Sequence, residues 1–395
     1  QQRELASLSD LIQEDLSGIS AIKIYRQEPT EEAAFQRLSD RYRDAALALA
    51  RTRSTLFPLL EGISSLSLLV LLGLGTSQLA NGNLTLGGLV ALILYVERLV
   101  FPTALLGFTL STFQTGQVSL ERVEELLRRQ PTIQSPAQPE ELRRVSQPGA
   151  IEAHDLHIRY ADSSSDALNG VSFKVKPGEL VAVVGPVGCG KTTLARALGR
   201  MVEVPAGQLG IDGQDITALS LDDLRGKISL VPQEGYLFTA TLAENLRFGR
   251  PDASDAEMQQ AARLAQLEGD VQAFPSGYDT LVGERGITLS GGQRQRTALA
   301  RALLVQAPIL VLDDALASVD NRTAAAILQS LTLNQQRSVL FISHQLSAAA
   351  ACDRVLVLDG GRVVQQGHHR ELVQQSGTYR RLWEREQAAT QLEAA

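Results

Sequence analysis

Eight consecutive residues carry the most specific chemical signal in this sequence. Residues 185–192 read Gly-Pro-Val-Gly-Cys-Gly-Lys-Thr and match the pattern G-x-x-x-x-G-K-[ST] at every position. An apolar run precedes them and a helical stretch follows, as this phosphate-binding motif requires. In such a turn, backbone N–H groups surround a polyphosphate, the lysine reaches the β- and γ-phosphates and the hydroxyl binds Mg²⁺. The predicted phosphate-binding residues are Gly185, Gly188, Cys189, Gly190, Lys191, Thr192 and Thr193, and Thr192 is also a predicted metal ligand.

Two further patterns follow this loop along the chain. The run Ile309–Leu312 reads as a buried strand that ends in Asp313, and in phosphate-loop enzymes such an aspartate holds Mg²⁺, usually through water. Residues 289–293 read Leu-Ser-Gly-Gly-Gln and precede a helix predicted from Arg294 to Leu303, which offers a second helix N-terminus to an anion. Two phosphate-binding faces in one chain argue against the alternative, a glycine-rich turn with a chance lysine.

The elements that must position these residues belong to an α/β domain. From Ile151 onward, strand-like segments alternate with helical stretches, and Val171–Lys176 has the period of two that suits a half-buried strand. Continuous apolar runs with the character of parallel strands follow at Leu180–Val184, Ile228–Val231, Ile309–Leu312, Val339–Ile342 and Val355–Leu358. We therefore expect a sheet with helices between its strands and the phosphate loop after an inner strand.

The first part of the chain is of a different kind, because residues 62–96 contain no charged side chain. Two apolar segments, about 56–80 and 84–106, are each long enough to cross a bilayer, and a short polar turn joins them. Arginines flank both segments on the side away from this turn, so both outer ends are expected in the cytoplasm. We expect an integral membrane segment of two helices, the second of which continues until shortly before Pro131.

Three charged residues interrupt the apolar segments. They are Glu61, near the cytoplasmic start of the first segment, and the adjacent Glu97 and Arg98 in the second. A charge at such depth must face protein or water rather than lipid. Two interpretations stay open: these side chains line a translocation path, or they pair with helices that this chain does not contain.

The remaining segments set the domain boundaries. Residues 1–50 have helical periodicity and, taken alone, read as an amphipathic hairpin that packs on itself, with a second helix from Glu31 to about Arg53. Residues 131–149 contain four prolines and read as a linker. The net charge of −7 and the lack of a basic stripe argue against a nucleic-acid partner, and two isolated cysteines favour a reducing, cytosolic setting without a disulfide.

Together, these motifs resemble an ABC transporter of the exporter type. Residues 150–387 resemble its nucleotide-binding domain, ahead of a tail at 388–395, and residues 1–130 resemble the end of its transmembrane domain, as in an N-terminally incomplete half-transporter. The motif Ser290-Gly291-Gly292-Gln293 after Leu289 discriminates this family from other ATPases. Within the resemblance, residues 14–28 match the coupling-helix region, and this interpretation replaces that of a self-packed hairpin. Residues 280–286 match an exporter-specific loop.

The resemblance also assigns roles to single residues. Tyr160 matches the aromatic that stacks on adenine, and Gln233 matches a residue that senses Mg²⁺ and takes part in catalysis. His344 matches the switch histidine at the γ-phosphate, and Asp320 lies in a loop at the nucleotide. The nucleotide contacts offered to a partner are Ser290, Gly291, Gly292 and Gln293. The implied cofactors are ATP and Mg²⁺, with Thr192, Gln233 and Asp313 as metal-site residues.

Two departures from the family pattern matter for function. Only two of the usual six spans are present, and the position of the glutamate that polarises the attacking water is Asp314, one methylene shorter. The pattern resembles the degenerate-site subunit of heterodimeric bacterial exporters, so we expect ATP hydrolysis driving export by a dimer in the inner membrane, with a cytoplasmic nucleotide domain and a heterodimer favoured. The alternative is a regulatory subunit that binds ATP, hydrolyses little and completes its partner's site. A soluble ABC ATPase is a third interpretation, which the two apolar segments disfavour. The cargo, a small molecule, lipid or peptide, is not specified by the sequence.

Overall fold

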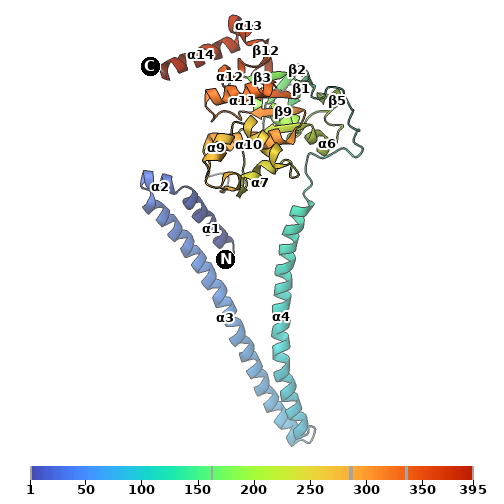
Figure 1. Ribbon diagram of the computed structural model, residues 1–395. Helices are drawn as coiled ribbons and strands as arrows, with labels where there is room; N and C mark the ends of the chain where they lie inside the picture. Colours follow the sequence, from blue (N-terminus) through green and yellow to red (C-terminus); the bar gives the residue numbers. More distant parts are fainter. Residues whose placement is uncertain (1, 162, 284–287, 334–336, 394–395) are drawn as a thin grey trace. The chain divides into compact units, whose positions relative to one another are not determined.

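The computed structural model describes residues 2–161, 163–283, 288–333 and 337–393 (Figure 1). The chain forms two compact units, residues 1–130 and residues 131–395. The described residues of the first unit form helices joined by short turns, and the second unit combines sheets and helices. This agrees with the predicted fold class, a helical membrane segment followed by an α/β domain.

The first unit consists of four helices. They are α1 (Gln2–Ser17), α2 (Ile19–Tyr25), α3 (Glu28–Ala80) and α4 (Leu86–Arg128). Gly18 separates α1 from α2, and its N–H still donates to the Glu14 carbonyl at 2.8 Å. The sequence predicted one helix up to about Arg53 and a separate span from residue 56, but α3 runs through both without a break. Pro58 lies inside α3 and removes one backbone hydrogen bond, which the turns on either side tolerate.

The turn between α3 and α4 is defined by local contacts. Thr85 caps α4 by accepting a hydrogen bond from the Gly88 N–H at 3.1 Å. Gly75 on α3 faces Leu89 on α4 so closely that a Cβ at position 75 would lie 2.3 Å from the leucine Cδ1. Leu89 is accordingly 5% exposed, so the hairpin is packed at its tip.

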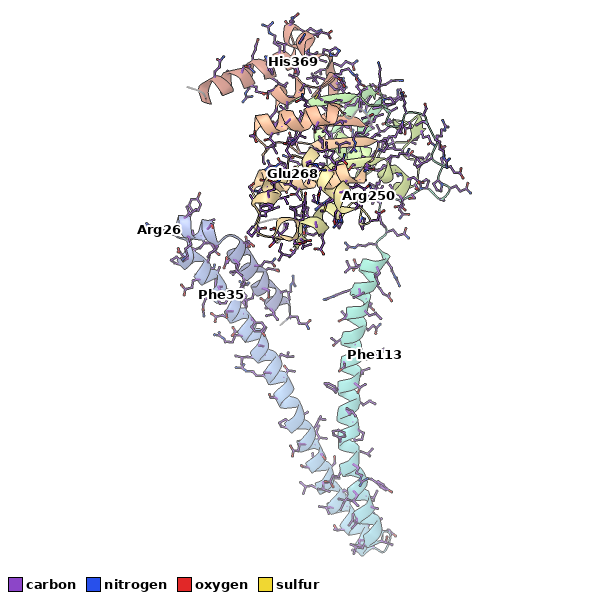
Figure 2. The ribbon with its side chains drawn as sticks, in the orientation of Figure 1. Arg26, Phe35, Phe113, Arg250, Glu268 and His369 are labelled. Atoms are coloured by element: carbon purple, nitrogen blue, oxygen red, sulfur yellow. The ribbon has the colours of Figure 1, made fainter. Side chains whose placement is uncertain are left out.

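Away from this turn, the two long helices expose large apolar side chains. Pro58–Ala80 and Leu86–Arg128 are long and apolar enough to cross a membrane, and little of either is buried within the chain. Phe113 projects from α4 and is largely exposed (Figure 2). Glu61, Glu97 and Arg98 are also exposed. These surfaces lack the packing partners of a soluble core helix.

The second unit is built around a six-stranded sheet with the order β12-β11-β3-β10-β9-β6. Its strands are parallel except for the edge strand β12, which pairs antiparallel with β11. The sequence predicted five of these six strands, all of them in the parallel part. The bounds are β3 (Leu180–Val184), β6 (Ile228–Val231), β9 (Ile309–Asp313), β10 (Ser338–Ile342), β11 (Arg354–Asp359) and β12 (Arg362–Gly367).

Smaller sheets complete the strand content. A four-stranded antiparallel sheet has the order β2-β1-β4-β5, and β7 pairs with β8. The bounds are β1 (Ile151–Ile158), β2 (Leu168–Val175), β4 (Leu209–Ile211), β5 (Gln214–Asp215), β7 (Ala240–Thr241) and β8 (Leu281–Val282).

Helices cover the main sheet and carry the loops that matter for function. Their bounds are α5 (Lys191–Leu198), α6 (Leu221–Gly226), α7 (Leu242–Arg247), α8 (Asp255–Leu264), α9 (Glu268–Ala273), α10 (Gly291–Val305), α11 (Asn321–Leu333), α12 (Leu346–Ala349), α13 (His369–Gln374) and α14 (Thr378–Glu393), with a 3₁₀ turn η1 (Gly277–Asp279).

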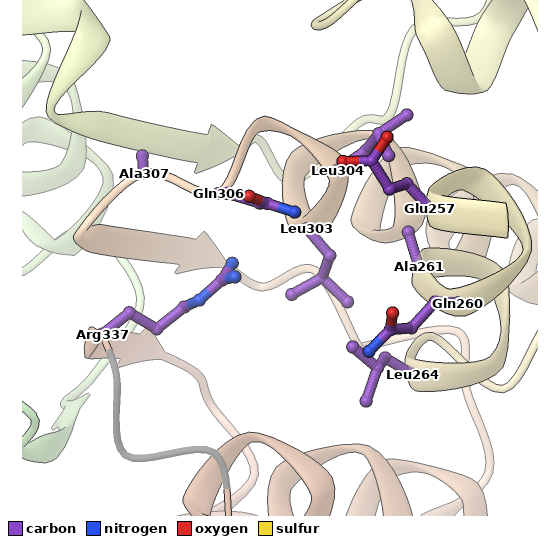
Figure 3. A pocket seen from close by; sticks show the side chains of 9 residues that line it. All are labelled: Glu257, Gln260, Ala261, Leu264, Leu303, Leu304, Gln306, Ala307 and Arg337. Carbon is purple, nitrogen blue, oxygen red and sulfur yellow. The ribbon is translucent and has the colours of Figure 1, made fainter. Parts of the chain in front are cut away.

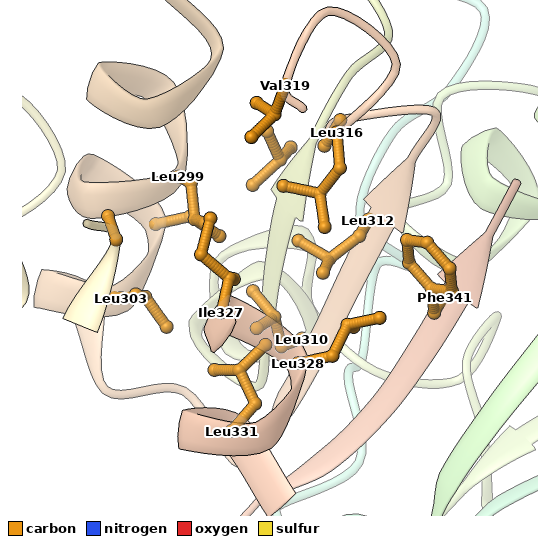
Figure 4. Packing of buried hydrophobic residues seen from close by; sticks show 14 of the residues in the cluster. Leu299, Leu303, Leu310, Leu312, Leu316, Val319, Ile327, Leu328, Leu331 and Phe341 are labelled. Atoms are coloured by element: carbon orange, nitrogen blue, oxygen red, sulfur yellow. The ribbon is translucent and has the colours of Figure 1, made fainter. Parts of the chain in front are cut away.

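Both faces of the central strands are buried, each in its own apolar cluster. On β9, Leu310 and Leu312 enter one cluster, whereas Ile309 and Val311 enter the other. The first cluster packs these strands against α10 and α11 (Figure 4). This explains the continuous apolar runs in the sequence, since a strand buried on both faces has no polar side to alternate with. The sheet is therefore a rigid support for the loops at its edge.

Residues 131–149 pack against the second unit by specific hydrogen bonds. The Glu140 N–H donates to the Ala218 carbonyl at 2.9 Å, and the Arg143 N–H donates to Gln214 Oε1 at 2.8 Å. The segment that was predicted as a linker thus contributes to the surface of the α/β unit. Cys189 and Cys352 are both buried and free.

Candidate nucleotide-binding site

The loop after β3 has the backbone conformation of a phosphate cradle. Gly185, Gly188 and Gly190 all have positive φ, at 157°, 81° and 102°. A Cβ at Gly185 would lie 2.0 Å from the Leu358 carbonyl oxygen, and one at Gly190 would lie 2.5 Å from the Ala167 oxygen. Both positions therefore require glycine, because neighbouring backbone leaves no room for a side chain.

Lys191 folds back over this loop from the first turn of α5. Its Nζ donates to the Gly185 carbonyl at 2.8 Å and to the Pro186 carbonyl at 2.9 Å. An ammonium held by carbonyls at the mouth of the cradle can exchange these contacts for phosphate oxygens. The same loop holds the Cys189 thiol, whose pKa is raised by burial despite the nearby lysine.

Thr192 and Asp313 meet beside this cradle, although they are far apart in sequence. The Thr192 hydroxyl donates to Asp313 Oδ1 at 3.2 Å, because α5 begins at the edge of the sheet where β9 ends. Asp313 is 4% exposed, and burial raises the pKa of its carboxyl although Thr192 opposes this. A hydroxyl and a carboxylate are hard oxygen ligands that fit Mg²⁺ with waters completing the shell. The cation would also offset the cost of burying the carboxylate.

Asp314 and His344 form a second pair at this edge. Asp314 Oδ1 lies 2.8 Å from His344 Nδ1 and also accepts a hydrogen bond from the His344 backbone N–H at 3.2 Å. The backbone of Asp314 adopts a left-handed conformation with φ of 48°, which aspartate tolerates better than most residues. Its carboxylate is therefore held toward the strand end that carries the histidine, a pairing that no sequence pattern indicates.

The Leu-Ser-Gly-Gly-Gln segment forms the N-terminus of α10. The helix begins at Gly291, three residues before the predicted start, because Ser290 and Gln293 form a reciprocal capping box. The Ser290 Oγ accepts from the Gln293 N–H at 3.3 Å, and Gln293 Oε1 accepts from the Ser290 N–H at 2.9 Å. The pattern S-x-x-Q was the available signal for this earlier start. Gln293 also donates to Asp270 at 3.1 Å, which ties the helix start to α9.

The signature glycines allow the loop after Asp314 to approach this helix. A Cβ at Gly292 would lie 2.9 Å from the Ser318 carbonyl oxygen, and one at Gly291 would lie 3.4 Å from the Ser318 Cβ. Gln295 fixes the same loop by accepting from the Ser318 N–H at 2.7 Å. Farther along, the Asp320 carboxylate accepts from the Thr323 N–H at 2.9 Å and so caps the start of α11.

Other predicted site residues lie at different distances from the cradle. The Tyr160 hydroxyl is 3.3 Å from the Thr193 Oγ1, so the predicted adenine-stacking residue borders the phosphate loop. Gln233 lines a hollow of about 370 Å³ together with Gly291, Arg294 and Ser318 on the signature side. Among the described residues, no hydrogen bond joins Gln233 to Thr192 or Asp313. Residues 284–286 of the predicted exporter-type loop lie outside the described residues.

The site residues thus fall into two groups. One group surrounds the phosphate loop, with Thr192, Asp313, Asp314 and His344; the other surrounds the N-terminus of α10. Within the described part of the chain, none of the hydrogen bonds joins residues 185–193 to residues 289–293. The two candidate phosphate-binding groups are therefore separate within the described part of the chain.

A further cavity of about 380 Å³ lies elsewhere in the second unit (Figure 3). Ala307 and Arg337, which line it, precede β9 and β10, whereas Asp313 and His344 lie at or beyond the opposite ends of these strands. It contains none of the predicted site residues. The Thr192–Asp313 and Asp314–His344 pairs lie instead at the carboxyl edge of the sheet, where α/β domains commonly bind ligands.

Comparison with known proteins identifies both units. Residues 168–317 match the ABC transporter family model, and residues 1–103 match that of the ABC transporter transmembrane region. The chain is 37% identical over 390 residues to a probable multidrug resistance ABC transporter ATP-binding/permease protein, YheI, of Bacillus subtilis, covering 98% of this chain and 66% of the relative. It is 37% identical to an ATP-dependent lipid A-core flippase of Burkholderia pseudomallei, covering 95% of this chain and 63% of the relative.

A solved structure gives the same result for the fold. The structure of a bacterial Atm1-family ABC exporter with ATP bound matches with a TM-score of 0.87 and 33% sequence identity, covering 97% of this chain and 67% of that one. The chain thus spans about two thirds of the length of the proteins it resembles. It belongs to the ABC transporter family, with the transmembrane region of an exporter fused to an ABC ATPase domain.

Proposed function

We propose that this chain is one subunit of a dimeric ABC exporter that binds and hydrolyses ATP to move a substrate across a bacterial inner membrane. The transmembrane unit would lie in the bilayer and the ATPase unit in the cytoplasm. The arrangement that carries this proposal is the pair of separate phosphate-binding faces. The phosphate loop and the signature helix are each half of an ATP site. Because they do not meet within one chain, a second chain is needed to complete either half.

ATP in this proposal lies on the phosphate loop, with Lys191 at the β- and γ-phosphates and Tyr160 at the adenine. Mg²⁺ would be held by Thr192 and, directly or through water, by Asp313, whose contact at 3.2 Å brings two suitable oxygens together. The metal would neutralise charge on the phosphates during transfer. Gln233 would reach this site only through a rearrangement of the loop after β6, because it lies on the signature side.

Hydrolysis at this site would depend on Asp314. Its carboxylate is the group available to orient water, but it is one methylene shorter than glutamate and is paired with His344 at 2.8 Å. We therefore propose that this site binds ATP well and hydrolyses it slowly. A partner with a glutamate at the equivalent position would carry most of the turnover, with Ser290 and Gly291–Gln293 of this chain on its nucleotide. This favours a heterodimer over a homodimer.

Coupling to transport would run through residues 14–28. In its own unit, α2 exposes Ile24 and Tyr25 to 74% and 73%, so both large side chains are available to a partner. We propose that this short helix docks on an ATPase domain of the dimer. The named relatives act on drugs or lipid A-core, and a small molecule, lipid or peptide is the class of cargo we propose here.

The proposal is tested by ATPase assays on the intact protein in lipid nanodiscs, co-expressed with its neighbouring subunit. Lys191→Ala removes the phosphate contact and should lower ATP binding to this chain by at least about tenfold. The matched control Lys174→Ala replaces an exposed lysine that pairs with Glu152 on the antiparallel sheet. Normal ATP photolabelling of the Lys191→Ala chain would contradict the proposed site.

A further inference from the structure

The segment that follows β10 is held by partners from three different elements. Five consecutive backbone N–H groups, at residues 343–347, each donate to a named acceptor. The Ser343 N–H donates to the Val183 carbonyl at 3.1 Å, and the His344 N–H donates to Asp314 Oδ1 at 3.2 Å. The Gln345 N–H donates to Ser343 Oγ at 3.0 Å. The conformation of the switch histidine is therefore set by contacts on both sides of it.

The last two of these N–H groups share one acceptor from the C-terminal helix. The Leu346 N–H donates to Glu386 Oε2 at 2.7 Å, and the Ser347 N–H donates to Glu386 Oε1 at 2.9 Å. They are the first two amides of α12, and Gln345 at its start makes no side-chain cap. Because the first amides of a helix have no partner inside it, a carboxylate from another helix takes the place of the missing cap.

The position of Glu386 is fixed by the packing of α14. Tyr379 is fully buried, its hydroxyl lies 2.7 Å from His369 Nδ1, and its N–H donates to Gln365 Oε1 at 3.0 Å. Trp383 packs on the same apolar cluster. Residues 379, 383 and 386 recur at steps of four and three, so they lie on one face of the helix and this face presents the carboxylate to α12.

We propose that Glu386 is a positioning residue for the switch histidine, connecting the C-terminal helix to the catalytic edge through the backbone of residues 346–347. The chain of contacts runs from Glu386 to the start of α12, then to His344 and Asp314. This role of Glu386 rests on the proposed function, since His344 acts on ATP only if this chain binds ATP. A displacement of α14 would then change hydrolysis without touching the nucleotide.

The direct test measures amide hydrogen exchange of residues 343–350 and ATPase kinetics in the intact, lipid-embedded dimer. Glu386→Ala should raise exchange at residues 346 and 347 by at least about tenfold, because both amides lose their acceptor. It should lower kcat at this chain's own site, followed by vanadate trapping on the separated subunit, roughly tenfold. The KM for ATP at that site should change less than about twofold, since geometry at the reacting group is lost rather than binding. Glu386→Gln keeps one acceptor oxygen, so its exchange rates and its kcat should lie between those of the unmodified chain and those of Glu386→Ala.

Glu384→Ala is the matched control, because this neighbour on α14 is exposed and pairs with Arg380 on its own helix. It should leave exchange and kinetics unchanged. In a chain that already carries His344→Ala, adding Glu386→Ala should lower kcat by a further factor of less than about two. This non-additivity is expected for two residues in one chain of contacts.

The possible results separate the two proposals. Unchanged exchange at 346–347, or full additivity with His344→Ala, would overturn the role of Glu386. Absence of any ATPase activity in the unmodified dimer would contradict the proposed function instead, and the exchange measurement would still decide whether Glu386 holds α12.

Discussion

Replacing Asp314 by glutamate tests how this chain handles the water that attacks ATP. In the present geometry, Asp314 Oδ1 is 2.8 Å from His344 Nδ1. Glutamate extends the carboxylate by one methylene, about 1.5 Å of additional reach. Misplacement of a catalytic group by about 1 Å can cost on the order of 10²-fold in rate. We therefore expect Asp314→Glu to raise hydrolysis at this site by about 10- to 100-fold, equal to roughly 1.4–2.7 kcal/mol of barrier.

The same substitution should slightly destabilise the fold. Position 314 has a φ of 48°, where aspartate is favoured over glutamate, so we expect a loss of less than about 1 kcal/mol of unfolding free energy. A faster enzyme with a marginally lower melting temperature is thus the expected combination. It separates a catalytic gain from a general stabilisation.

The assay must report on this chain's own site. Vanadate trapping of labelled nucleotide, followed by separation of the two subunits, counts the turnover at each phosphate loop. Asp279→Glu is the matched control, since this aspartate is exposed in a 3₁₀ turn away from the sheet edge. Equal trapping on Asp314→Glu and unmodified chains would refute the reasoning that the short side chain limits the rate.

Three further predictions concern single contacts. Gly292→Ala should lower vanadate trapping on the partner roughly tenfold, because the new Cβ would lie 2.9 Å from the Ser318 carbonyl oxygen and displace the signature segment. ATP photolabelling of this chain should stay normal. Reduced labelling of this chain would argue against the prediction. Burial opposes ionisation of Glu179, but its two contacts with Arg354, at 2.8 and 3.1 Å, and the hydrogen bond from the Lys176 N–H together lower its pKa. Glu179→Gln should therefore lower the free energy of unfolding, measured with denaturant at pH 7, by about 1–3 kcal/mol. The difference from the unmodified chain should shrink as the pH falls below the ordinary glutamate pKa near 4.3. A loss that does not depend on pH would exclude the ion pair as its cause. Burial raises the pKa of Cys352 to about 12. Iodoacetamide at pH 8 should therefore alkylate this thiol at least about 100-fold more slowly in the folded protein than in the unfolded protein. Comparable rates would contradict its burial.

The strand, loop and helix around Lys191 were predictable because their signals are local. Gly185 and Gly190, which have positive φ, stand at the two glycine positions of the motif, and the strands buried on both faces are continuous apolar runs. The start of α10 at Gly291 was missed because the glycines suggested a loop, although Ser290 and Gln293 contain the capping pattern. The continuity of α3 through Pro58 was missed because an apolar span after a polar helix was treated as a new element.

Contacts between residues distant in sequence could not be predicted from one chain. The Asp314–His344 pair spans 30 residues, and the contact of Glu386 with the start of α12 spans about 40. Neither has a sequence signal, because each depends on how the sheet aligns its strand ends and how α14 packs. The position of Gln233 on the signature side is likewise a property of the folded loop.

The central claim is that the signature helix of this chain acts on the nucleotide of another chain. The most direct measurement places Ser290→Arg in one subunit of the assembled dimer and follows vanadate-trapped nucleotide on each subunit separately. The bulky cation at the α10 N-terminus should abolish trapping on the opposite subunit, while ATP photolabelling of the mutated chain's own phosphate loop stays normal. Loss of nucleotide from the mutated chain's own loop, with trapping on the opposite subunit intact, would contradict the account.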